Sequence, residues 1–289
     1  MKKTHAGRKH LWRTSTALPY IVTALMLYLM AACQRNPQTE SNMQASAHLD
    51  SLARTYLSGR FDNPEETTRR LEQLENQQKD TADRFHVELY KAVVLNEMNK
   101  KRECNDIRNK VLQWCKAHPG HNYLSGMVWN HLGVELVGAG KIHESCKYFE
   151  KACHMLDGRI VNQSLINAYI NAANANLHIG RPVTAVQHYR RAIFLADSLN
   201  PAIYCGLGQV YSMLENYPEA RSCLNMAELR IHQQPPMERG FYFMTRGNCC
   251  FFEKKYEQAL TMFDSAHVCA KATGDEINMV RSECNMGET

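Results

Sequence analysis

Residues 201–231 read PAIYCGLGQVYSMLENYPEARSCLNMAELRI and predict two amphipathic helices joined by a short turn. In the first half, apolar residues fall at i, i+3, i+4 and i+7, the spacing of one helix face: Tyr204, Leu207, Gly208 and Tyr211. Pro218 then stands where the first turn of a new helix tolerates proline. The second half carries its own stripe: Ala220, Leu224 and Ala227. Because Gly208 and Ala220 are small, they allow the two helices to approach closely.

The same pattern recurs along the chain. Other copies begin at Trp129, Tyr169 and Phe243, so that with Tyr204 the first aromatics lie 35–40 residues apart. The spacing resembles the tetratricopeptide repeat, in which a Trp-x2-Leu-Gly-x2-Tyr helix precedes an Ala-x3-Phe helix in units of about 34 residues. The resemblance implies an all-α fold, a right-handed superhelical solenoid of antiparallel helix pairs. Its units are expected near residues 126–159, 166–199, 201–234 and 240–273.

The flanks of this array follow the pattern less well. Residues 46–125 match the consensus poorly and predict degenerate N-terminal helical hairpins, with a helix start at Asn63-Pro64. At the other end, Glu283, Met286 and Gly287 repeat the spacing of a first helix. Residues 280–289 therefore predict an incomplete unit, and the array is expected to span residues 126–289.

The N-terminal residues predict export. A basic start followed by a short apolar run makes residues 1–32 a signal peptide. The run ends in Leu-Met-Ala-Ala-Cys, which resembles the lipobox of bacterial lipoproteins and implies lipidation of Cys33. Residues 33–45 are polar and predict a flexible tether. The resemblance implies a lipid-anchored protein of the bacterial cell envelope, facing the periplasm or the cell surface; an uncleaved signal anchor is the alternative.

The charge of the chain does not indicate nucleic-acid binding. The formal net charge is +5. Five basic residues and no acidic ones lie within residues 1–32, so the remainder is balanced. A balanced chain has no global field that attracts DNA or RNA.

No motif of catalysis, metal binding or cofactor binding is present. The sequence lacks G-x-S-x-G, H-E-x-x-H, a P-loop and G-x-G-x-x-G. We therefore expect no enzyme activity, no catalytic residue, no metal and no cofactor. The cysteines beyond Cys33 scatter over predicted helix faces, which favours packing thiols over disulfides and a cell with little oxidant.

The resemblance implies a membrane-anchored scaffold that binds a protein or peptide in its concave groove. Its groove positions include four amide side chains that are partner-binding candidates: Asn130, Asn174, Gln209 and Asn248. Beside them, we expect an apolar pocket at the C-terminal end, formed by Phe241, Phe251 and Phe252. An amide offers both a donor and an acceptor to a peptide backbone. Because lysine and arginine are almost absent from these positions, we expect no ligand held by its terminal carboxylate. The alternative function is the N-terminal sensor part of a truncated membrane-spanning transcriptional regulator.

Overall fold

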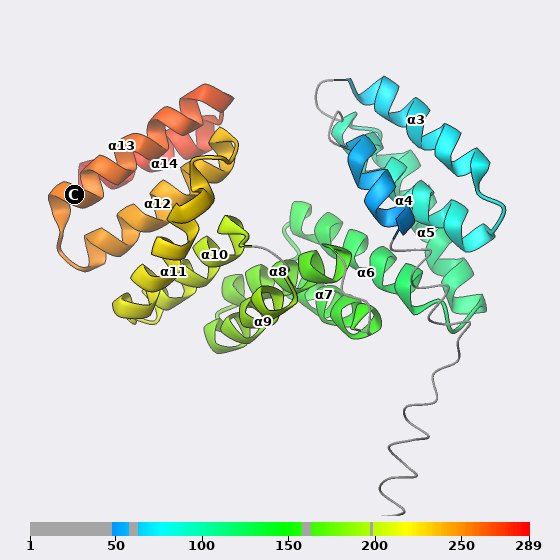
Figure 1. Cartoon of the computed structure of the whole chain (residues 1–289), viewed down its shortest axis with the longest axis horizontal. Helices are drawn as coiled ribbons and strands as arrows, with labels where there is room; N and C mark the ends of the chain where they lie inside the picture. The colour runs from blue at the N-terminus through cyan, green and yellow to red at the C-terminus, as the bar shows by residue number, and fades with distance from the viewer. Residues whose placement is uncertain (1–47, 58–62, 158–162, 197–198) are drawn as a thin grey trace, which may run out of the picture. The chain divides into compact units, whose positions relative to one another are not determined.

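The computed structural model describes residues 48–57, 63–157, 163–196 and 199–289, and within these ranges the chain forms helices and no strand. A helical segment at residues 48–57 comes first (Figure 1). The labelled helices that follow are α3 (Pro64–Gln77), α4 (Thr81–Glu97), α5 (Lys101–Ala117), α6 (Asn122–Gly138), α7 (Ile142–Leu156), α8 (Gln163–His178), α9 (Pro182–Leu195), α10 (Pro201–Met213), α11 (Tyr217–Ile231), α12 (Pro236–Phe252), α13 (Tyr256–Thr273) and α14 (Glu276–Glu288).

Successive helices pack as antiparallel pairs. The pairs are α4 with α5, α6 with α7, α8 with α9, α10 with α11, and α12 with α13, and from α5 onward each second helix also contacts the first helix of the next pair. Figure 1 shows this alternation along the chain. The predicted all-α solenoid of antiparallel helix pairs is confirmed. We call α4, α6, α8, α10, α12 and α14 the first helices.

The turn inside each pair has one backbone geometry. The residue two before each second helix adopts a left-handed φ of 57° to 75°: Asn99, Gly140, Gly180, Glu215 and Lys254. The next residue donates its N–H to the carbonyl five residues earlier at 2.8–2.9 Å, as from Lys100 to Leu95. This is the Schellman motif, which satisfies carbonyls left free at a helix end. The α4–α5 pair shares it, so a unit that matches the consensus poorly is closed by the same turn.

Small residues mark the crossing point within each pair. A Cβ built on Gly133 would lie 2.5 Å from the ring of Phe149, and one on Gly247 would lie 2.5 Å from Phe263. A Cβ on Gly208 would lie 3.1 Å from Leu224 and 3.3 Å from the carbonyl oxygen of Ala220. The expectation of close approach at Gly208 is confirmed.

The N-terminal helices and the cysteines also follow the sequence pattern. Asn63 caps α3 by accepting the Glu66 N–H at 3.0 Å, and α3 buries Leu71 and Leu74. Most cysteines in the described ranges are buried as free thiols among apolar side chains: Cys104, Cys115, Cys146, Cys153, Cys205, Cys249 and Cys269. These positions agree with a packing role. No helix in the described ranges is both long and apolar enough to cross a bilayer.

Candidate functional site

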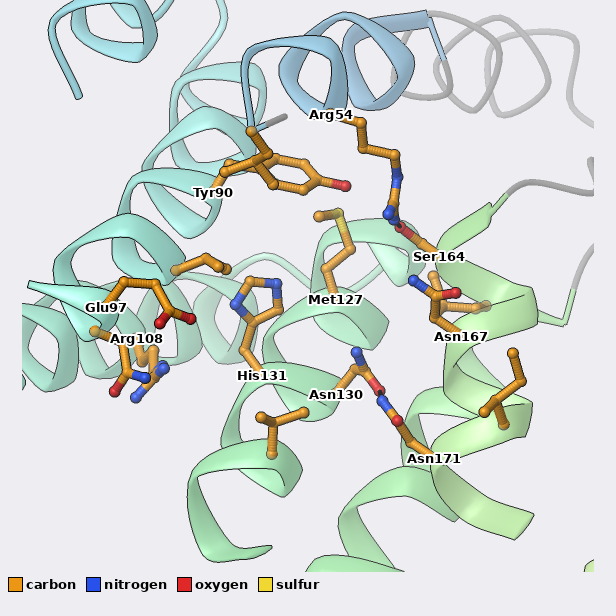
Figure 2. Close-up of a pocket in the computed structure, with 16 residues that line it drawn as sticks. Arg54, Tyr90, Glu97, Arg108, Met127, Asn130, His131, Ser164, Asn167 and Asn171 are labelled. Atoms are coloured by element: carbon orange, nitrogen blue, oxygen red, sulfur yellow. Dashed lines mark hydrogen bonds between the residues drawn. The ribbon is translucent and has the colours of Figure 1, made fainter. Parts of the chain in front are cut away.

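A pocket of about 450 Å³ opens along three first helices, α4, α6 and α8 (Figure 2). Arg54 and Leu57 of the segment at residues 48–57, and Arg108 of α5, complete its wall. The other lining side chains are mostly polar or aromatic and include Tyr90, Asn96, Glu97, Asn130, His131, Ser164, Asn167 and Asn171. We call this the N-terminal pocket.

Asp50 forms the centre of a buried polar cluster beside this pocket. Its carboxylate accepts hydrogen bonds from the Tyr90 hydroxyl and from Ser164 Oγ (3.0 Å), and it pairs with Arg54 Nε at 2.9 Å. Arg54 Nη2 also donates to Ser164 Oγ at 2.8 Å, and Figure 2 shows these two side chains meeting. His86 Nε2 lies 3.5 Å from Asp50 Oδ1. The cluster joins residues 48–57 to α4 and α8 and holds Arg54 in the pocket wall.

The Asp50 carboxyl stays ionised within the cluster. Burial alone would raise the pKa of the Asp50 carboxyl, because it disfavours the charged form. The donors His86 and Tyr90 and the positive charge of Arg54 together outweigh burial and hold this pKa well below its usual range. Burial and then the negative charge of Asp50 raise the pKa of Tyr90. At neutral pH the cluster therefore contains one carboxylate, one guanidinium and a neutral phenol.

Two amides from neighbouring first helices meet inside the pocket. Asn171 of α8 donates from Nδ2 to Oδ1 of Asn130 of α6 at 3.0 Å, and Figure 2 shows the side chains pointing toward one another. The Asn130 amino group and the Asn171 carbonyl have no hydrogen-bond partner within the part of the chain that the structure describes. One free donor and one free acceptor side by side match the acceptor and donor of a peptide group.

The opposite wall carries a paired arginine, a neutral histidine and an exposed glutamate. Arg108 is only 5% exposed, pairs with Glu135 at 3.0 Å, and leaves its Nε without a partner among the described residues. Burial, followed by the positive charges of Arg108 and Arg54, lowers the pKa of His131 to about 3, so the imidazole is neutral at physiological pH. Glu97 is exposed and makes no ion pair within the described ranges. The pocket thus presents amides and a neutral imidazole beside paired arginines and the unpaired side chain of Glu97.

A second hollow lies at the other end of the array. A pocket of about 320 Å³, the C-terminal pocket, is lined mainly by α12, α13 and α14, with Gln209 contributed by α10. Asn248 and Arg281 line both this pocket and an adjoining one of about 470 Å³. Asn285 of α14 donates to Asn248 Oδ1 at 3.2 Å. The C-terminal pocket therefore combines amide side chains with one arginine.

The structure distributes the predicted partner-binding residues over separate places. Gln209, Asn248 and Phe241 line the C-terminal pocket, and Asn248, Phe251 and Phe252 line the adjoining one. Asn130 lies in the N-terminal pocket. Asn174 lines none of these pockets: it is exposed on α8, and its Oδ1 accepts the hydroxyl of Tyr189 in the paired helix α9. Whether a partner contacts these residues stays a prediction.

Several side chains of the N-terminal pocket were not among the predicted site residues. Asn167 and Asn171 lie four residues apart, one helical turn along the face of α8 that meets Asn130, and this spacing was a readable signal. Arg54 and Arg108 gave no signal, because they belong to units without the repeat consensus.

No group of three or more His, Cys, Asp or Glu side chains in the described ranges is placed to hold a metal ion. Burial raises the pKa of Cys153 and of Cys205 to about 12, so these thiols stay protonated and unreactive at neutral pH. Cys33, the predicted lipidation site, lies outside the described residues.

Comparison with known proteins identifies the fold. No family model matches the chain, and no curated protein sequence matches it. Among solved structures, it resembles a chain of the APC/C hetero-tetramer Cut9–Hcn1 (TM-score 0.59, 20% identity, 79% of this chain and 39% of that chain). It also resembles PilF of Pseudomonas aeruginosa (TM-score 0.53, 15% identity, 81% of this chain and 93% of that chain).

A third similar structure is described as containing tetratricopeptide-like repeats. It is a Podosopora anserina protein of kinesin-light-chain type with nearly identical TPR-like repeats (TM-score 0.52, 13% identity, 68% of this chain and 99% of that chain). All three identities are too low to carry function across, so the likeness establishes the fold alone. The fold is that of tetratricopeptide-repeat solenoids, as the repeat spacing predicts. This chain spans less than half of the matched chain in the Cut9–Hcn1 complex and nearly all of the other two matched chains.

Proposed function

We propose that this protein is a lipid-anchored scaffold that binds an extended segment of a partner protein along its first helices, without catalysis. The observation that carries the proposal is the Asn130–Asn171 pair, which leaves one donor and one acceptor free in the N-terminal pocket. An extended peptide presents the complementary acceptor and donor at every residue, so main-chain hydrogen bonds supply affinity with little dependence on sequence.

The electrostatics of the N-terminal pocket do not favour a ligand that binds through a carboxylate. Arg54 and Arg108 are already paired with carboxylates, and His131 carries no charge at physiological pH. A free carboxylate entering this pocket would find no unpaired cation. The uncharged main chain of a peptide avoids the cost of burying an unpaired charge.

The proposed anchor rests on the sequence of the N-terminal residues. The lipobox-like Leu29 to Cys33 follows a short apolar run, and residues 33–45 have the polar composition of a tether. An anchor of this kind would hold the scaffold at the bacterial cell envelope, where it would bring its partner to the membrane. Replacing Cys33 with alanine should abolish incorporation of labelled fatty acid. Continued incorporation would remove the anchor from the proposal without affecting the pocket.

Site-specific photo-crosslinking tests the binding surface. A photoreactive amino acid is placed at Ile170, which lines the N-terminal pocket, or at Gln258, which is exposed on α13 outside the N-terminal and C-terminal pockets. We expect a discrete adduct from position 170 in intact cells, and loss of that adduct when Asn130 and Asn171 are both replaced by alanine. Adducts from position 258 with none from position 170 would refute binding in the N-terminal pocket.

A further inference from the structure

Glu97 is the charged lining residue of the N-terminal pocket that has no ion-pair partner among the described residues. The other two charged lining residues are arginines, and each is paired with a carboxylate that does not itself line the pocket. Arg54 pairs with Asp50 at 2.9 Å. Arg108 pairs with Glu135 at 3.0 Å. Glu97 ends α4 and is exposed, so its carboxylate is free to meet a cation.

The pocket and its paired groups therefore carry an excess of one negative charge. Two guanidiniums stand against three carboxylates, because Glu97 adds to the two that are already paired. His131 lines the same wall and adds no charge at physiological pH, because burial lowers its pKa to about 3. Opposite charges across an interface favour association, and like charges disfavour it. A ligand with one positive charge is thus preferred here over a neutral or acidic one.

The lysines around the α4–α5 turn leave Glu97 available. Lys100 and Lys101 follow it in the sequence, but both are exposed and neither lines the pocket. Neither pairs with Glu97 in the part of the chain that the structure describes. Lys110 of α5 pairs with Glu88 at 2.9 Å instead. The cation that Glu97 lacks can therefore come from a ligand.

Apolar side chains flank the polar groups of the pocket. Val93 precedes Glu97 by one helical turn on α4, and Val134 follows Asn130 by one turn on α6. Val134 is 50% exposed. In Figure 2, His131 lies between Glu97 and Asn130. Lysine and arginine carry a charged head on an apolar stem, so such a side chain covers valine surface while its charge stays at the carboxylate.

We infer that the N-terminal pocket selects partner segments that carry a lysine or an arginine, whose stem lies over Val93 and Val134 and whose charge pairs with Glu97. The inference rests on the proposed function, since it assigns one side chain to the segment bound there. The Asn130–Asn171 pair supplies contacts to the main chain, and Glu97 supplies the preference for a side chain.

A random peptide display library is the first probe. It is selected in parallel against the full chain, Glu97→Gln and the matched control Glu72→Gln. Glu72 is exposed on α3 outside the N-terminal pocket, so its substitution removes the same charge from another surface. Because Glu97 is exposed and unpaired, neither variant should change the fold. We expect lysine and arginine to be enriched at one peptide position with the wild type and with Glu72→Gln, and not with Glu97→Gln.

A double-mutant cycle then measures the charge contact. The most enriched peptide is synthesised with a fluorophore, and its arginine or lysine is replaced by citrulline or acetyl-lysine, which keep the stem and lose the charge. Fluorescence anisotropy should show roughly three- to tenfold weaker binding of the neutral peptide to the wild type, as for a partly exposed ion pair. The two peptides should bind Glu97→Gln equally. Added salt should reduce the difference on the wild type, since it screens exposed charges.

The failure of this inference differs from the failure of the proposed function. Selected peptides that need Asn130 and Asn171 but show no preference for a basic residue would overturn the inference and leave the proposed function standing. A basic preference that survives Glu97→Gln would do the same. If no selected peptide loses binding in Asn130→Ala/Asn171→Ala, the proposed function is refuted, and the inference with it.

Discussion

Replacing Gly133 with alanine tests the packing that defines the fold. The new Cβ would lie 2.5, 2.7 and 3.0 Å from three ring atoms of Phe149, where ordinary carbon contacts need about 3.5–4.0 Å. Phe149 is 2% exposed, so its ring has no free space to enter. We place the overpacking cost near the upper end of its usual range, about 3 kcal/mol. The better helix propensity of alanine offsets about 1 kcal/mol of this loss in the free energy of unfolding. The net expectation is a loss of about 2 kcal/mol.

The same substitution at Gly138 should have the opposite sign. Gly138 lies in the same helix with nothing within 4 Å of its Cβ position. Gly138→Ala therefore keeps only the propensity gain, up to about 1 kcal/mol of stabilisation. Urea unfolding followed by circular dichroism at 222 nm measures both variants. Adding Phe149→Leu to Gly133→Ala should recover part of the loss. Equal effects of the two alanines would refute the crossing point at Gly133.

Further predictions concern the buried cluster and the turns. Asp50→Asn should destabilise the chain by roughly 2–4 kcal/mol in urea unfolding at pH 7, because it leaves the Arg54 charge without its partner. The pKa of Asp50 is lower in the folded state than in the unfolded state. Ionised Asp50 therefore stabilises the fold fully above the unfolded pKa of about 4, and this stabilisation is lost as the pH falls below that value. Between pH 5 and pH 3 the variant should thus lose less stability than the wild type. Lys254→Gly should stabilise by roughly 0.5–1 kcal/mol, because Lys254 holds a left-handed φ of 62° that glycine adopts without strain. An unchanged or lower thermal midpoint for Lys254→Gly would mean that this turn stores no strain.

The repeat units were predictable because their signal is local. Small residues such as Gly208 and the large residues facing them recur at fixed spacing within one unit, so one stretch of sequence reports on its own helix pair. The turn at Lys254 gave no local signal, since lysine rarely takes the left-handed conformation that it has there.

The N-terminal pocket was hard to predict for the opposite reason. The polar cluster beside it joins Asp50 to Ser164, which lie 114 residues apart in the sequence. No local sequence pattern indicates that contact. Asn174 was assigned to the groove by its repeat position, and no sequence pattern indicated that its Oδ1 accepts the hydroxyl of Tyr189. Repeat position gives the face of a helix, whereas the hydrogen-bond partner of each side chain depends on the neighbouring helix.

The most direct test of peptide binding is a calorimetric titration of the full chain with a peptide selected against it from a display library. The wild type is compared with Asn130→Ala/Asn171→Ala and with Gln258→Ala, an exposed amide outside the N-terminal and C-terminal pockets. Two lost hydrogen bonds should weaken binding by about 1–3 kcal/mol in the double variant, with folding unchanged by circular dichroism. Gln258→Ala should bind as the wild type does. Unchanged affinity in the double variant would contradict recognition of a peptide by the Asn130–Asn171 pair.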